Sequence, residues 1–385
     1  MSDQYGGVSD FQKQAELASE WLTNVSQAAV QAGVTLTLSQ ALPSMLLAAA
    51  QLPAVTQVRV SERYSTIDSH QQWDIGLASL LPAALRIAPF KDTFWSQSKE
   101  PGYPHPGSEE RNPILQALVA TLSTGLVAVG DSADAIKSSL LAWCCRSDGV
   151  VLRPSTPAVA IDDHIVKSAL DASSGSAATR HVWKSLSTIS VAGNQTGVYH
   201  QGIIVAVNTS GGYKVTPEMI FPRLFKNQKN LRLWSVDSDN SSIFWQDFSQ
   251  GHPLSFPKEC WEVRGATLPC LFHVSTALTV HGGLTDVHLC GEVNKFVPLS
   301  PQRVLLVNVT TGVTLTLAGE PGETLTFDYY VNDQRRQNDV TIAPNGLATL
   351  ALNLTWVTTT TTTTTTTKNQ LLFTPQRHSH PALPV

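Results

Sequence analysis

The sequence predicts an α/β region followed by an all-β region, and two observations carry this prediction. Up to about residue 150, apolar residues with helical spacing alternate with short β-branched runs. From about residue 182, short alternating runs are separated by Gly, Pro and Asn-Asp turns, as in the stretches 202–208, 303–309, 313–317, 324–331 and 348–353. The second pattern is typical of an antiparallel β-sandwich.

Four consecutive β/α units are expected in the first region. Helices are expected at 9–33, 43–52, 73–87, 113–123 and from about 132 to 149, with strands at 34–39, 56–61, 90–95 and 126–129. Ser9 suits an N-cap, Pro113 a first helical position, and Gly33 and Gly149 helix ends. Right-handed crossovers would place the four strands side by side in one parallel sheet.

Four such units correspond to half of a (β/α)8 barrel of the TIM type, which has eight strands. Half a barrel leaves two long parallel edges without partners. We therefore expect that a preceding N-terminal half of the protein, or a partner chain, completes the barrel. The alternative is a small open doubly wound sheet, which is disfavoured because no Gly-rich phosphate loop follows any of the strands.

The change of pattern suggests four segments along the chain. Residues 1–155 are expected to form the partial barrel, 156–181 a linker, and 182–356 the β-sandwich. Residues 357–385 contain ten consecutive threonines and are expected to be a disordered, low-complexity tail.

Composition excludes several functional classes. The 385 residues carry a net charge of −4 with no basic block, so we expect no nucleic-acid partner. No apolar run is long enough for a membrane span, so we expect no membrane partner either. The segment after Met1 lacks the features of a signal peptide. The location in the cell stays open between the cytoplasm and, if the true N-terminus lies upstream, secretion.

The cysteines do not suggest a metal site, because none of the five forms a CxxC pair. We expect buried free thiols, with a Cys260–Cys270 disulfide as the alternative. The sequence contains no cofactor-binding motif, and we expect the protein to use no cofactor.

Several motifs resemble, in family order, the second half of the catalytic barrel of α-galactosidases and raffinose synthases, a group of retaining glycoside hydrolases. The likeness is closest to an uncharacterised branch of that group. The motifs are Arg-Val-Ser-Glu at 59–62 with Tyr64, Pro-Phe-Lys-Asp-Thr-Phe-Trp-Ser at 89–96, Asp131, and Cys-Arg-Ser-Asp-Gly at 145–149. Residues 291–303 are similar to the C-terminal β-sandwich of that branch.

The resemblance implies a pair of catalytic carboxylates that is incomplete here. In the family, one carboxylate after the fourth strand is the nucleophile, and by the resemblance this chain begins after that strand. The second carboxylate, the general acid/base, falls on Arg63, whose guanidinium stays protonated and cannot exchange a proton with the leaving oxygen. Glu62 is the remaining candidate proton donor, although alternation along a strand points it to the opposite face.

By the same resemblance, four residues are candidates for binding the sugar. Arg59 would lie beside the acid/base position, Lys91 and Asp92 would contact sugar hydroxyls, and Trp95 would stack on a sugar ring. The structural alternatives are a strand-end salt bridge for Arg59, an ion pair for Lys91 and Asp92, and core packing for Trp95.

The sequence therefore predicts a divergent or truncated glycoside-hydrolase-like protein that is inactive as this chain. Its expected ligand is a carbohydrate of the α-galactoside type. Two alternatives remain open: a non-catalytic carbohydrate-binding or structural module, or an active α-glycosidase if the missing N-terminal half is supplied.

Overall fold

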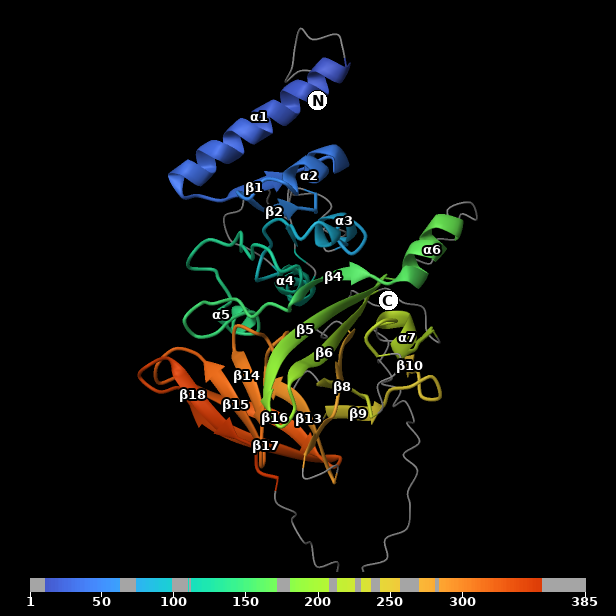
Figure 1. Ribbon diagram of the computed structural model, residues 1–385, viewed down its shortest axis with the longest axis vertical. Coiled ribbons are helices and arrows are strands. Elements are labelled where there is room, and N and C mark those ends of the chain that lie inside the picture. The colour runs from blue at the N-terminus through green and yellow to red at the C-terminus, as the bar shows by residue number, and fades with distance from the viewer. Residues whose placement is uncertain are drawn as a thin grey trace, which may run out of the picture. The chain divides into compact units, whose positions relative to one another are not determined.

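The computed structural model describes residues 11–62, 74–98, 110, 112–171, 181–207, 213–225, 230–236, 243–256, 270–280 and 284–354. The chain divides into two compact units, Met1–Leu352 and Asn353–Val385, and every described helix and strand belongs to the first (Figure 1). The described helices are α1 (Phe11–Ala32), α2 (Pro43–Ala49), α3 (Leu80–Ala84), α4 (Pro113–Leu122), α5 (Ser138–Leu141), α6 (Asp162–Asp171) and α7 (Pro217–Ile220).

The described strands are β1 to β18, numbered in chain order. The strands up to residue 255 are β1 (Leu36–Ser39), β2 (Val55–Arg59), β3 (Ala88–Phe90), β4 (Thr156–Ala160), β5 (His181–Gly193), β6 (Gly197–Val207), β7 (Lys214–Val215), β8 (Arg232–Val236), β9 (Ile243–Asp247) and β10 (Leu254–Ser255). The later strands are β11 (Cys270–Ser275), β12 (Leu278–Val280), β13 (Thr285–Glu292), β14 (Val304–Val309), β15 (Val313–Ala318), β16 (Thr324–Val331), β17 (Gln334–Thr341) and β18 (Leu347–Ala351).

A small parallel sheet is formed by the first three strands, in the order β1-β2-β3. Helices α1 and α2 lie against it (Figure 1), and Leu22 of α1 and Leu46 of α2 share a core with Val55 and Val58 of β2. Helix α2 begins with Pro43 in its first turn, where a missing backbone N–H costs nothing. The parallel pairing of these three strands agrees with the β/α pattern in the sequence.

The expectation of half a (β/α)8 barrel is nevertheless wrong. Among the described residues, strand (39%) exceeds helix (21%), and the strands form several sheets with no closed barrel. In place of a fourth strand at 126–129, the structure has a single parallel bridge between Phe94 and Val129. The last expected helix is reduced to the four residues of α5. The β/α pattern therefore holds for the first three strands and does not continue to a fourth β/α unit.

Helix α4 gives the physical reason. In a barrel of this type the helices form an outer ring, so each needs a polar face. All residues of α4 from Leu115 to Leu122 are buried, including Gln116 and Thr121. The helix contributes to a core that also includes Trp183, Val205 and Phe296, from segments far along the chain. A helix that is buried all round lies in the middle of the structure instead of covering a barrel.

The largest sheet has nine strands and is mostly antiparallel. Its path is β18-β15-β14-β5-β6-β11-β8-β9, and β4 pairs with β5 beside this path. Strands β5 and β6 run side by side over most of their length (Figure 1). The pair β14–β5 is parallel, which departs from a purely antiparallel sandwich. Strand β4 and helix α6 occupy part of 156–181, the segment expected as a linker.

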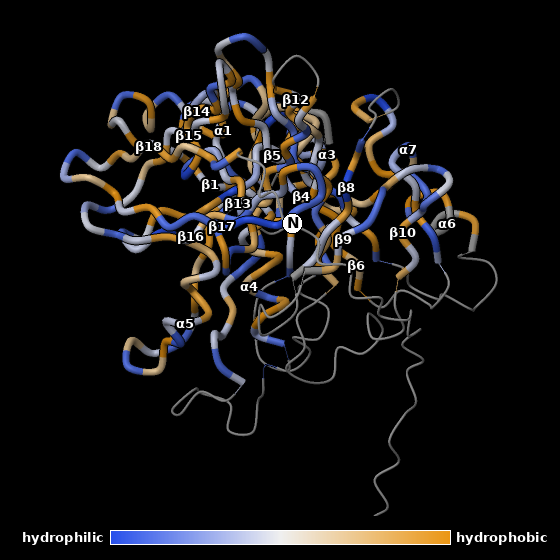
Figure 2. The backbone as a smooth tube through the Cα atoms, turned by 90° about the horizontal axis from the view of Figure 1, so that it is seen from below, coloured by the Kyte–Doolittle hydropathy of each residue, from blue (hydrophilic) through white to orange (hydrophobic). Residues whose placement is uncertain are grey.

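A second sheet, in the order β12-β13-β16-β17, packs against the first. The contact includes Trp234 of β8, Cys290 of β13 and Tyr330 of β16, and Trp245 of β9 stacks on Tyr330 with ring centroids 3.6 Å apart. Hydrophobic and hydrophilic stretches alternate along the backbone tube (Figure 2), and in β15 every second residue is buried. Period-two burial is the property that the sequence pattern predicted for this region.

Two further expectations can be compared with the described residues. Cys270 is disulfide-bonded, whereas Cys144, Cys145 and Cys290 are free thiols, so the expectation of five free thiols is wrong for Cys270. Cys260 lies outside the described residues. No described helix is both long enough and apolar enough to cross a membrane.

Candidate functional site

The end of the small parallel sheet brings two of the expected site residues together. Arg59 is the last residue of β2, and Asp92 follows β3 by two residues. Because the two strands are parallel, their carboxyl ends lie at the same edge. Arg59 Nη1 donates a hydrogen bond to Asp92 Oδ2 at 3.2 Å. The strand-end salt bridge named as the structural alternative for Arg59 is therefore present, with Asp92 as its partner, while a role of either residue in binding a sugar stays a prediction.

Hydrogen bonds to the backbone hold the Asp92 carboxylate in place. The backbone N–H of Asp92 donates to Ser61 Oγ at 2.8 Å, and Ser61 Oγ donates to the carbonyl of Glu62 at 2.9 Å. Asp92 Oδ1 accepts a hydrogen bond from the backbone N–H of Thr93 at 3.0 Å. The pair with Arg59 therefore has a defined orientation, with both side chains less than a fifth exposed.

An open depression of about 370 Å³ lies beside this pair. Its described lining residues are Gln40, Ala41, Leu46, Val58, Arg59, Val60, Ser61, Glu62, Ala78 and Pro82. Glu62 is exposed and brings the only carboxyl group among them. Arg63, the position implied for the acid/base, lies outside the described residues. We call Arg59, Ser61, Glu62, Asp92 and this depression the strand-end site.

Lys91 and Trp95 point into the protein. Lys91 is 1% exposed, and its Nζ donates to the carbonyls of Asp92 at 2.9 Å and Thr93 at 3.3 Å. Burial lowers the pKa of Lys91 to about 7, although the charges of Glu110 and Asp92 oppose the change. Trp95 is 3% exposed within the central core, which favours packing over a sugar-stacking role. Neither residue lines the depression.

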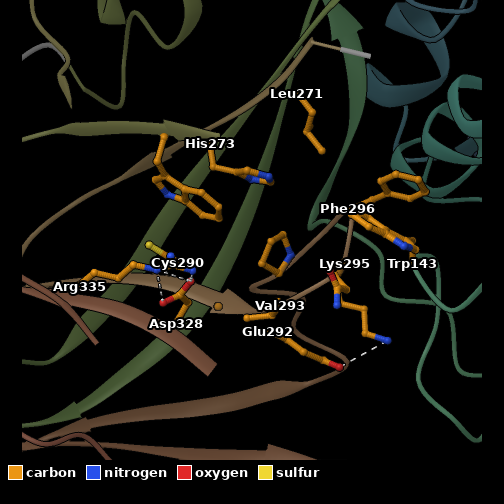
Figure 3. A pocket seen from close by; sticks show the side chains of 14 residues that line it. Trp143, Leu271, His273, Cys290, Glu292, Val293, Lys295, Phe296, Asp328 and Arg335 are labelled. Carbon is orange, nitrogen blue, oxygen red and sulfur yellow. Dashed lines mark hydrogen bonds and ion pairs between the residues drawn. The ribbon is translucent and has the colours of Figure 1, made fainter. Parts of the chain in front are cut away.

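Sequence reasoning missed a second cavity, between the two large sheets. Figure 3 shows its lining side chains, which come from β8, β11, β13, β16, β17, the loop at 293–298 and Trp143 after α5. Its volume is about 50 Å³. The lining residues are Trp143, Trp234, Leu271, His273, Cys290, Gly291, Glu292, Val293, Asn294, Lys295, Phe296, Pro298, Asp328 and Arg335. We call it the inter-sheet cavity.

Charged side chains in the inter-sheet cavity occur as pairs. Arg335 Nη2 donates to Asp328 Oδ2 at 2.7 Å, and Lys295 Nζ lies 3.4 Å from Glu292 Oε1 (Figure 3). Glu292 also accepts a hydrogen bond of 2.6 Å from Nε of the fully buried Arg303. No spacing within residues 291–303 indicates that Gly291 pairs with Asp328 of the neighbouring strand β16.

No group of three or more His, Cys, Asp or Glu residues that could hold a metal ion occurs among the described residues. The sequence matches no protein-family model and no curated protein. The resemblance to α-galactosidases and raffinose synthases therefore stays a prediction from the motifs.

Proposed function

We propose that this chain binds a carbohydrate at the strand-end site without hydrolysing it. The observation that carries the proposal is the oriented Arg59–Asp92 pair beside an open polar depression. A guanidinium beside a carboxylate offers donors and acceptors at fixed positions, which is what a pair of neighbouring sugar hydroxyls requires.

The charges at the strand-end site favour a neutral ligand. Arg59 faces Asp92, and the exposed carboxylate of Glu62 adds a second negative charge to the rim of the depression. Among the described side chains of the strand-end site, a phosphorylated or carboxylated ligand would meet two carboxylates against one guanidinium. Uncharged hydroxyl groups can accept from Arg59 and donate to Glu62 without that repulsion.

The shortage of available carboxyl groups among the described residues of the site favours binding over hydrolysis. Glycoside hydrolysis uses two carboxyl groups on either side of the bond, about 5–5.5 Å apart in retaining enzymes and about 6.5–9.5 Å apart in inverting ones. Glu62 is the only carboxyl among the described lining residues, and Asp92 is held by Arg59 and by the backbone N–H of Thr93.

The test is a calorimetric or ligand-observed NMR titration with methyl α-galactopyranoside and raffinose. We expect saturable binding to the chain that weakens by at least about ten-fold in Arg59→Gln, because a hydrogen bond to a charged group is lost. Arg223→Gln, an exposed arginine outside the site, is the matched control and should bind as the unchanged chain does. Equal binding by Arg59→Gln and the unchanged chain would remove the strand-end site from the proposal.

Hydrolysis is tested separately with a nitrophenyl α-galactoside. We expect no release of nitrophenol above background. Turnover that is reproducible and disappears in Glu62→Gln would show that Glu62 acts as a proton donor, and a binding-only function would then be wrong.

A further inference from the structure

One lining residue of the inter-sheet cavity carries a buried polar atom that has no hydrogen-bond partner among the described residues. His273 is 3% exposed, and its Nδ1 has no hydrogen-bond partner among the described residues. Its ring stacks on Trp234 with centroids 4.3 Å apart and points into the cavity (Figure 3). His273 lines the cavity, and buried polar groups in native proteins are nearly always hydrogen-bonded, so a ligand that offers a donor or acceptor to the imidazole ring is favoured there.

The His273 ring is neutral under physiological conditions. Burial lowers its pKa to about 3, because the cavity offers a protonated ring no compensation for lost hydration. A neutral imidazole nitrogen accepts from, or donates to, a hydroxyl group. The partner that fits is therefore a hydroxyl on water or on a small ligand.

The other lining groups exclude a charged ligand and favour one with an apolar side. The pairs Asp328–Arg335 and Glu292–Lys295 cancel in charge, so neither an anion nor a cation finds an excess of opposite charge. Trp143 and Phe296 form one aromatic wall, with centroids 5.5 Å apart, and Trp234 forms another. Aromatic walls with a few polar groups suit carbon-bound hydrogens on one side of a ligand and hydroxyls on the other.

The volume sets the size of the ligand. About 50 Å³ holds roughly three to five water molecules at about 10–15 Å³ each. A three-carbon polyol is on this scale, whereas a whole disaccharide is much larger. A purely apolar molecule of this size would leave the His273 nitrogen without a partner.

We infer that the inter-sheet cavity is a binding site for a small neutral polyol, which a hydroxyl group anchors on His273 between the aromatic walls. This site shares no described lining residue with the strand-end site, and it does not depend on the function proposed there.

The test is a titration of the full chain with glycerol, followed by NMR of isotope-labelled histidine and aromatic side chains. We expect a saturable change and intermolecular contacts between glycerol and the rings of Trp143 and Phe296. Glycerate, the matched anion, should bind more weakly. The contacts with Trp143 and Phe296 require no variant, so they test the site even if substitutions impair folding.

Variants then test the anchor. In His273→Phe, which keeps an aromatic ring but removes the nitrogen, we expect binding to weaken by about ten-fold. His288→Phe is the matched control: His288 is equally buried and its Nδ1 also lacks a partner among the described residues, but it does not line the cavity. Arg59→Gln should leave glycerol binding unchanged. The inference is overturned if glycerol gives no saturable contacts with the cavity rings, or if folded His273→Phe binds it as tightly as the unchanged chain.

Discussion

The small parallel sheet β1–β3 and the nine-stranded sheet around β5 are built on different scales. The strands of the first have three to five residues, and its core lies between neighbouring segments of the chain. In the second, β5 has thirteen residues and β6 eleven, and the core includes residues from α4 to β6 and from the 293–298 loop. The first region depends on local packing, and the second on contacts between distant parts of the chain.

Hydrogen bonds between remote segments reinforce the second region. Lys295 Nζ donates to the carbonyls of Ala142 and Cys145, and Arg146 Nη1 donates to the carbonyl of Gln302. Arg303 is fully buried and binds Glu292 and Glu323 together. We therefore expect that a substitution which removes one of these long-range contacts lowers the free energy of unfolding more than an equivalent substitution at the edge of the small sheet.

The largest effect is expected for Arg303→Met. This change leaves the carboxylates of Glu292 and Glu323 without their shared buried partner, so we expect a loss of about 3–5 kcal/mol in the free energy of unfolding. The measurement is urea unfolding, with the exposed Arg223→Met as the control. A loss no larger than that of the control would show that the Arg303 network is not central to stability.

Two glycines with positive φ extend the comparison: Gly33 precedes β1 of the small sheet, and Gly291 lies in β13 of the four-stranded sheet. Gly291 has φ +113°, and a Cβ there would lie 2.5 Å from the backbone carbon of Pro298, so Gly291→Ala should cost about 3 kcal/mol. Gly33 has φ +67° and open space around it, so Gly33→Ala should cost about 1 kcal/mol from backbone strain alone. Thermal unfolding of the two variants measures the difference. Equal losses of stability would mean that the structure around Gly291 and Pro298 adjusts to the added Cβ without further cost.

Lys91 should make stability depend on pH in the first region. Its pKa is lowered in the folded protein to about 7, from 10.5, so the unfolded chain binds more protons between these values. Stability should therefore rise as the pH increases from about 7 towards 10.5, by at most about 1.4 kcal/mol per pH unit. Denaturant unfolding of the unchanged chain and of Lys91→Met at pH 7 and 8.5 isolates this contribution. If the stability of Lys91→Met depends on pH as strongly as that of the unchanged chain, other titratable groups cause the dependence.

The smallest effect on stability is expected for Arg59→Gln at the edge of the small sheet. A single partly exposed ion pair typically contributes about 0.2–1 kcal/mol, so unfolding should change little although sugar binding weakens. Parallel measurements of urea unfolding and of the binding titration separate the two. A stability loss near that of Arg303→Met would make Arg59 a structural residue first.

Most of the strand-end site could be predicted from the sequence, because it needs only two parallel strands that are close in the chain. The alternation of apolar runs placed β1 and β2 nearly at their observed positions, whereas β3 ends at Phe90, where the expected strand begins. The parallel pairing of β2 and β3 then brings Arg59 next to Asp92. The inter-sheet cavity could not be predicted in this way. His273 and Trp234 become neighbours only because β8 and β11 pair, and Asp328 faces the same cavity from another sheet.

The sequence by itself determined the local structure of the clearest segments, because hydrophobic period and turn residues act over a few positions. These segments are α1, α2 and α4 and the strands β1, β2, β14, β15, β16 and β18. Tertiary structure alone decided that α4 lies in a central core and that the fourth expected strand is a single bridge at Val129. It also decided that β14 joins β5 in parallel. These outcomes depend on which surfaces, far apart in the chain, bury the most apolar area when they pack together. Such a choice leaves no repeating pattern in the local sequence.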